Sequence, residues 1–126
     1  MVRRLVSNED AERLQCWFLQ FMRDEDFQPD PDKLPQDRRY RPVKGLIGPT
    51  QLCEAAGVNI ATTRMFNKDP YVPFPEYLRK LVLALRQMLQ DLGHPRWREV
   101  TVVRAYIEAG YLTRQDVADY VEVDYV

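Results

Sequence analysis

Few residues of this 126-residue sequence are placed to carry out acid–base, thiol or metal chemistry. His94 is the one histidine, and it follows a predicted helix end, where a capping role is expected rather than a catalytic one. Cys16 and Cys53 fall in apolar helical patterns that are typical of buried, reduced thiols. The sequence has no Cys/His spacing suited to zinc, no phosphate-binding glycine loop and no nucleophile elbow. We therefore expect neither an enzyme nor a metal or cofactor site.

Two further groups of side chains have both a structural and a functional interpretation. The acidic run Asp24-Glu25-Asp26 is expected to be a solvated helix end, and cation binding is its alternative. The aromatic residues Trp17, Trp97 and Tyr106 are expected to lie in the core, and a platform for stacking bases is the alternative.

The most informative segment is residues 48–67, GPTQLCEAAGVNIATTRMFN. Gly57 stands between two short helical patterns, at a position where a tight bend requires a residue that tolerates a left-handed backbone. Cys53 is small enough to let the two helices approach. The apolar residues expected to fix the crossing angle are Leu52, Ala56, Val58 and Phe66. Gly48 and Pro49 suit the start of the first helix, and Asn59 suits the cap of the second.

These residues resemble the helix-turn-helix of the Cro and lambda-repressor-like class over about 40 residues, from Ile47 to Leu85. The likeness includes the loop Phe66-Asn67-Lys68-Asp69-Pro70 and the following helix, Tyr77-Leu78-Arg79-Lys80-Leu81-Val82-Leu83-Ala84-Leu85. Its first half is also similar to the helix-turn-helix of MerR and LacI. The resemblance implies a transcriptional regulator, in the manner of a repressor, that binds double-stranded DNA. The alternative is two ordinary packed helices in an all-helical domain.

If the motif is a helix-turn-helix, the second helix enters the major groove and its outer side chains meet base edges. The residues expected to point outward are Asn59, Ile60, Ala61, Thr62, Arg64 and Met65. Arg64 can bind guanine through two hydrogen bonds, whereas Ile60, Ala61 or Thr62 can contact a thymine methyl group. The residues expected to hold phosphates are Thr50, Gln51, Asn67 and Lys68.

Charge is distributed unevenly around a net value of −1. Residues 38–80 carry eight Lys or Arg against three Asp or Glu, and both flanking regions are acidic. Part of this basic region belongs to a proline-rich arm, residues 24–48, whose cations are Arg38, Arg39, Arg41 and Lys44. The arm can follow a DNA backbone or enter a minor groove, and a plain solvated linker is its alternative.

Apolar periodicity predicts an all-α fold, a single compact domain over residues 1–126 with a central helix-turn-helix. Helices are expected at Ser7–Arg23, Pro49–Ala56, Asn59–Asn67, Pro75–Leu92, Arg96–Ala109 and Arg114–Val121, followed by a short terminal strand in 122–126. In the Arg96–Ala109 helix the inward residues are expected to be Trp97, Val100, Val103 and Ile107.

Apolar residues exceed what a chain of this size readily buries, so we expect a homodimer formed by helices outside the helix-turn-helix. The acidic flanks keep a second function open, a helical adaptor that binds a protein partner without DNA. No apolar run reaches the length of a membrane span, and the N-terminus lacks the pattern of a signal peptide. A cytoplasmic protein with no membrane contact is therefore expected.

Overall fold

The computed structural model describes residues 8–27 and 46–113. Three of the expectations above fall outside these residues: the arm cations Arg38, Arg39, Arg41 and Lys44, the helix at 114–121 and the strand at 122–126.

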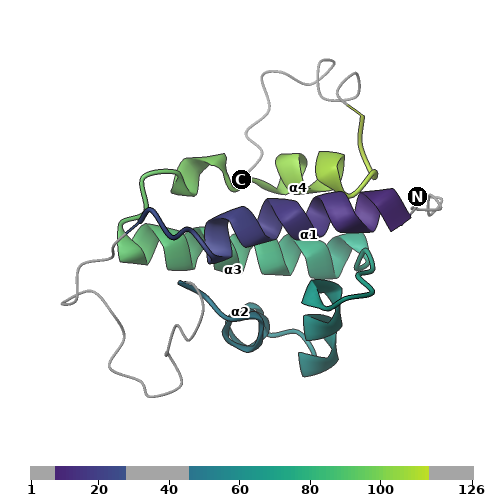
Figure 1. Ribbon diagram of the computed structural model, residues 1–126, viewed down its shortest axis with the longest axis horizontal. Coiled ribbons are helices and arrows are strands. Elements are labelled where there is room, and N and C mark those ends of the chain that lie inside the picture. Colours follow the sequence, from purple (N-terminus) through teal and green to yellow (C-terminus); the bar gives the residue numbers. More distant parts are fainter. Residues whose placement is uncertain (1–7, 28–45, 114–126) are drawn as a thin grey trace.

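The described part of the chain is all-helical and contains no strand. Its elements are α1 (Asn8–Met22), α2 (Pro49–Ala56), η2 (Ile60–Phe66), α3 (Pro75–Leu92), η3 (Trp97–Glu99) and α4 (Val102–Glu108), where η marks a 3₁₀-helix. In Figure 1, α1 and α3 run along the long axis, with α4 on one side of them and α2 on the other. The predicted all-α fold is therefore confirmed, and none of the described helices is long and apolar enough to cross a membrane.

Helix α3 is the centre of the molecule, since it contacts α2, α4 and η3. Its bounds are those the sequence predicts. Pro75 occupies the first turn, and Gly93 ends the helix in a left-handed conformation, with φ 76°. The predicted apolar stripe is buried at Leu78, Leu81, Val82, Leu85, Leu89 and Leu92, and Met88 is half-buried at its edge.

Helix α1 supplies the aromatic part of the core. Trp17 lies edge-on to Phe18 and Phe21, with ring centroids 5.1 and 5.6 Å apart. The expected burial of Trp17 is thus confirmed. Cys16, by contrast, is exposed, so the expectation of two buried thiols is wrong for this residue. Its neighbours at helical spacing, Arg13 and Gln20, are exposed too, which places Cys16 on the outer side of the helix.

The predicted helix over 96–109 is two elements, η3 and α4, because the chain breaks at Val100 and Thr101. Thr101 caps the second element, and its hydroxyl oxygen accepts from the Arg104 N–H at 3.2 Å. The restart changes which residues face inward. The buried positions are Val100, Val102, Ala105 and Ala109, whereas Trp97, Val103 and Ile107 are only half-buried.

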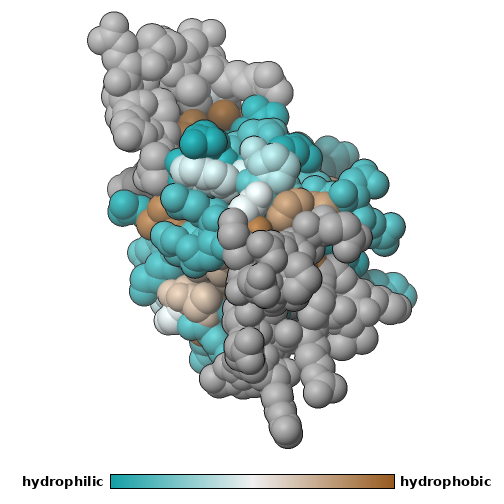
Figure 2. All heavy atoms as spheres, turned by 90° about the vertical axis from the view of Figure 1, so that its left-hand side faces the viewer, coloured by the Kyte–Doolittle hydropathy of each residue, from teal (hydrophilic) through white to brown (hydrophobic). Residues whose placement is uncertain are grey.

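The surface at the end of the molecule where α3 terminates is mainly hydrophilic. Figure 2 views this end, where hydrophilic side chains cover most of the described surface and apolar ones appear as small separate areas. Trp97, in η3, is half-buried, and the guanidinium carbons of Arg86 and Arg98 lie 4.8 and 4.5 Å from its ring centroid. Two cations therefore already lie over this ring, which disfavours its use as a platform for a base.

Candidate nucleic-acid interface

The turn between α2 and η2 is built on a left-handed glycine. Gly57 adopts a left-handed conformation, with φ 70° and ψ 28°. Its N–H donates to the Glu54 carbonyl at 3.2 Å, and the next N–H, of Val58, donates to the Cys53 carbonyl at 3.1 Å. These bonds satisfy the last carbonyls of α2. The glycine turn that the sequence predicts is therefore present.

Helix α2 is held by a capped first turn and by two buried side chains. Pro49 is in its first turn, and the Gln51 amide oxygen accepts from the Gly48 N–H at 2.9 Å. Leu52 and Cys53 are fully buried, as predicted, and burial raises the pKa of the Cys53 thiol. Gln51, expected on a phosphate, instead turns back on the start of its own helix. Thr50, the other expected phosphate contact, is exposed.

The second helix differs from the expected one in its period. η2 is a 3₁₀-helix, so residues three apart lie above one another. One column of side chains, Thr62 and Met65, is buried, with exposed fractions of 9% and 0%. Ala61 and Arg64 form another column, which is exposed, and Asn67, the extended residue directly after the helix, is exposed as well. We name these three residues the η2 outer column.

The burial of Thr62 and Met65 corrects the sequence-based expectation, which had both pointing outward. In a 3₁₀-helix these two residues, three positions apart, lie directly over one another, and here their shared side of the helix faces the core. The expectation had placed six residues on one outward face. Four of the six expected outward residues are exposed, namely Asn59, Ile60, Ala61 and Arg64. Asn59 also caps the helix, because its side-chain oxygen accepts from the Ala61 N–H at 2.9 Å. Asn67 and Lys68, expected on phosphates, are exposed.

Helix α1 holds η2 in place through contacts that the sequence analysis did not foresee. The Gln15 side-chain amide donates to the carbonyls of Met65 and Asn67, at 3.1 and 2.8 Å. Phe18 packs edge-on against Phe66, with ring centroids 5.7 Å apart. The end of the short helix is therefore fixed by a separate helix about fifty positions earlier in the chain, a separation that gives no local signal.

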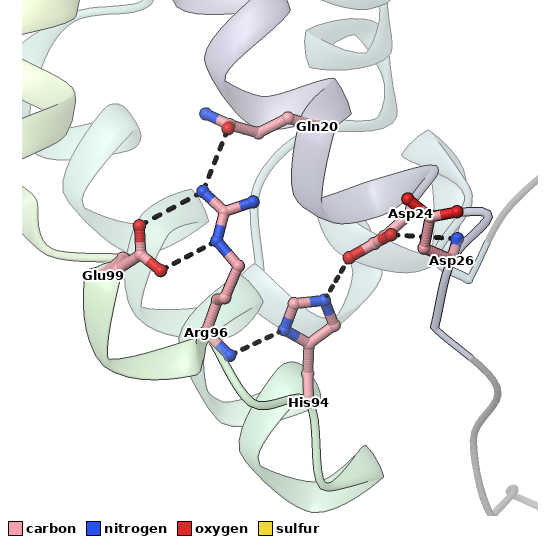
Figure 3. A network of polar contacts seen from close by, with 6 residues as sticks. All are labelled: Gln20, Asp24, Asp26, His94, Arg96 and Glu99. Atoms are coloured by element: carbon pink, nitrogen blue, oxygen red, sulfur yellow. Dashed lines mark hydrogen bonds and ion pairs between the residues drawn. The ribbon is translucent and has the colours of Figure 1, made fainter.

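A second fixed point joins the end of α1 to the end of α3 (Figure 3). The buried His94 ring accepts the Arg96 N–H at its Nδ1, at 3.0 Å, so its proton is on Nε2. That Nε2–H donates to Asp24 Oδ2 at 2.8 Å, and Asp24 Oδ1 accepts from the Asp26 N–H at 3.1 Å. The hydrogen bond from His94 is the main cause that lowers the pKa of Asp24. Phe27 packs on the same ring, 4.7 Å away.

The expected capping role of His94 and the expected exposure of Glu25 and Asp26 are present, but this network adds a role for the His94 side chain and corrects that of Asp24. The backbone of His94 completes the cap of α3, its N–H donating to the Leu89 carbonyl at 2.9 Å, whereas the side chain is an internal anchor. Asp24 is the partner of that anchor rather than a solvated helix end. In the described residues, no group of three or more His, Cys, Asp or Glu side chains is arranged to hold a metal ion.

The residues on both sides of the arm are held near the C-terminal end of α1. Phe27 packs on His94 at one end. At the other end, the N–H groups of Leu46 and Ile47 both donate to the Met22 carbonyl, at 2.7 and 3.1 Å. Residues 27 and 46 are therefore held beside the C-terminal end of α1, and α2 begins three residues after Leu46.

A groove of about 630 Å³ lies between α1, η3 and α4. Its cations are compensated by nearby carboxylates. Arg96 makes two hydrogen bonds to Glu99, at 2.8 and 3.1 Å. Glu108 lies 3.4 Å from Arg13 and 3.5 Å from Arg104. An anion would have to displace these pairs, so the groove is a weaker candidate than the α2–η2 surface.

Comparison of the chain with family models, with curated proteins and with solved structures gives no match. The fold and the site therefore rest on the geometry described above.

Proposed function

We propose that the chain binds double-stranded DNA in a sequence-specific manner and acts as a transcriptional regulator. The observation that carries the proposal is the η2 outer column, Ala61 and Arg64 exposed on a short helix and Asn67 exposed at its end, after a left-handed glycine turn. A helix-turn-helix places such side chains in the major groove. The bonds from Gln15 hold the helix end rigidly, as a reading surface requires.

Within this proposal each exposed residue has a role set by its chemistry. Arg64 makes the two-hydrogen-bond contact to guanine, and Ala61 or Ile60 meets a thymine methyl group. Asn67 and Lys68, at the end of η2, hold phosphates. Thr50 does the same at the start of α2.

The arm adds to the affinity for DNA in a way that does not depend on the DNA sequence. Arg41 lies five residues before Leu46, which is held beside the C-terminal end of α1 and three residues before α2 begins. Together with Arg38 and Arg39, it belongs to a run of cations that precedes α2 in the sequence. Cations near phosphates release counterions and so make the affinity depend on salt.

The test is selection of bound sequences from random double-stranded DNA, followed by fluorescence anisotropy on the selected site and on a scrambled one. We expect Arg64→Ala to weaken binding to the selected site by about 1–3 kcal/mol and to relax the preference at one base pair. Arg98→Ala is the matched control, because it removes an exposed arginine from η3 and should leave DNA binding unchanged. Equal losses on the selected and scrambled DNA would reduce Arg64 to a phosphate contact, and the absence of any selected sequence would refute the proposal.

A second function, a helical adaptor that binds a protein partner, is favoured by one observation. Ile60 is 52% exposed at the start of η2, and Arg64 is the one charged residue between Asn59 and Phe66. A mixed apolar and polar surface of this kind also suits a protein interface. Capture of a partner that is abolished by Ile60→Asp, in a chain that selects no DNA sequence, would establish this alternative.

A further inference from the structure

The outward side of α3 carries residues at alternating steps of three and four. They are Tyr77, Lys80, Ala84, Gln87 and Asp91, and we name them the α3 outer face. Tyr77, Lys80, Gln87 and Asp91 are exposed and Ala84 is half-buried. This spacing keeps side chains on one line along a helix, as in the seam of a coiled coil. The line lies away from the buried stripe that begins at Leu78.

Exposed aromatic side chains mark the N-terminal end of this face. Tyr71, Phe74 and Tyr77 are 40%, 46% and 43% exposed, and the rings of Phe74 and Tyr77 are 6.4 Å apart. Large apolar side chains gathered on a surface commonly mark a contact with another molecule.

The backbone beneath these aromatics is held rigidly. The Tyr111 hydroxyl donates to the Pro73 carbonyl at 2.7 Å, and the Tyr106 hydroxyl donates to the Pro75 carbonyl at 2.9 Å. Burial raises the pKa of Tyr106, which keeps its hydroxyl protonated as a donor. A rigid aromatic surface loses little conformational entropy on binding, which is the property of an interface anchor.

The charges on the α3 outer face are complementary to one another in an antiparallel arrangement. Lys80 lies in the N-terminal half, with its Nζ 5.9 Å from the Tyr77 ring centre. Asp91 lies in the C-terminal half, and one of its oxygens accepts from the Gln87 side chain at 2.8 Å. Its other oxygen is not engaged in that bond. Two copies of α3 running in opposite directions bring each Lys80 opposite the Asp91 of the other copy.

We infer that the α3 outer face pairs with the same face of a second copy of this chain, antiparallel about a two-fold axis. Ala84 lies near the middle of the face, where a small side chain lets the two helices approach. Tyr77 then reaches the turn after α3 of the second copy, where Pro95 is exposed. The inference deepens the proposed function, on which its biological meaning rests, because two-fold pairing presents two reading helices to two half-sites.

The test is the oligomeric state of charge-exchanged variants. The monomer has a mass of 14.9 kDa, and we expect sedimentation and light scattering of the unaltered chain to give twice this value at micromolar concentration. Lys80→Glu places a negative charge opposite Asp91 of the other copy, and two-fold symmetry makes this repulsion occur twice in the dimer. We therefore expect the dissociation constant of the dimer to rise by about tenfold or more. Asp91→Lys should have the same effect, and the doubly exchanged variant should recover the dimer.

Arg79→Glu is the matched control, since it makes the same charge reversal one residue away and off the face. It should leave the dimer intact. A monomer at every concentration, or equal losses for the exchanges at positions 79 and 80, or no recovery in the double variant, would overturn the inference. Circular dichroism of each variant shows that the helices remain folded. Anisotropy on selected DNA separates the two ideas: a monomer that selects a sequence refutes only the dimer, and a dimer that selects none refutes only the DNA function.

Discussion

Replacement of Asp24 measures how strongly the buried His94 anchor stabilises the fold. Both carboxylate oxygens of Asp24 accept a hydrogen bond, one from His94 Nε2–H and one from the Asp26 N–H. The His94 side chain is 0% exposed, so Asp24→Ala leaves its Nε2–H buried without an acceptor. Such a group costs about 1–3 kcal/mol of unfolding free energy. Asp24→Asn keeps one acceptor and turns an N–H toward the other donor, so its loss should be smaller.

The assay is urea and thermal unfolding near neutral pH, with Glu25→Ala as the control because that exposed neighbour should change stability by less than about 0.5 kcal/mol. For a domain of this size, 1 kcal/mol corresponds to about 3–5 °C in Tm. We expect the free energy of unfolding to fall most for Asp24→Ala, by an intermediate amount for Asp24→Asn and hardly at all for Glu25→Ala. Equal stability of all four proteins would refute the argument that His94 depends on this carboxylate.

The stability difference between the unaltered chain and Asp24→Asn should depend on pH, because folding lowers the pKa of Asp24. The pKa of Asp24 is lowered from 3.8 in the folded state, so its contribution is fully present above the unfolded value. This stabilising contribution is lost as the pH falls through the lower pKa that Asp24 has in the folded state. The stability difference between the unaltered chain and Asp24→Asn should therefore be constant near neutrality and shrink below about pH 4. A difference that grows on acidification would contradict the lowered pKa.

Three further outcomes are expected. Gly57→Ala should cost about 1–2 kcal/mol in urea unfolding from backbone strain alone, since a Cβ at this position meets no atom within 4 Å, and Gly57→Asn should cost less. In the native protein, Cys16 should react rapidly with a thiol reagent and Cys53 only as the chain unfolds, and two rapid thiols would contradict the burial of Cys53. Replacing the three arm arginines by alanine should reduce the slope of log affinity against log salt by up to about 3, and an unchanged slope would make the arm a plain linker.

The elements whose positions follow from local pattern were predictable from the sequence. Helix α3 has a continuous apolar stripe, a proline at its start and a glycine at its end, and each of these signals acts within a few residues. The left-handed turn at Gly57 has the same local origin. The break at Thr101 was missed because the apolar period continues across it, and the cap that stops and restarts the helix is a single hydroxyl.

The candidate site was predictable only in part, because its outer surface depends on contacts between distant segments. Nothing near Met65 in the sequence indicates that Gln15 binds its carbonyl, a contact across 50 positions. The pairing of Asp24 with His94 spans 70 positions and likewise has no local signal. The period of η2, which decides that Thr62 faces the core while Arg64 faces out, is a tertiary result in a segment too short to show its own periodicity.

The short period of η2 also limits how much DNA one copy can read. A 3₁₀-helix rises about 2.0 Å per residue, so Ile60 and Arg64, the outermost residues assigned to bases, lie about 8 Å apart along its axis. Base pairs are spaced about 3.4 Å apart, so these residues cover roughly two to three of them. A site this short gives little discrimination against competing DNA. If the proposed function and the proposed dimer hold, the selected sequences should contain two short, inverted half-sites with centres about one helical turn apart. A selected motif that is long, continuous and asymmetric would contradict this reasoning, since the η2 outer column is too short to read it.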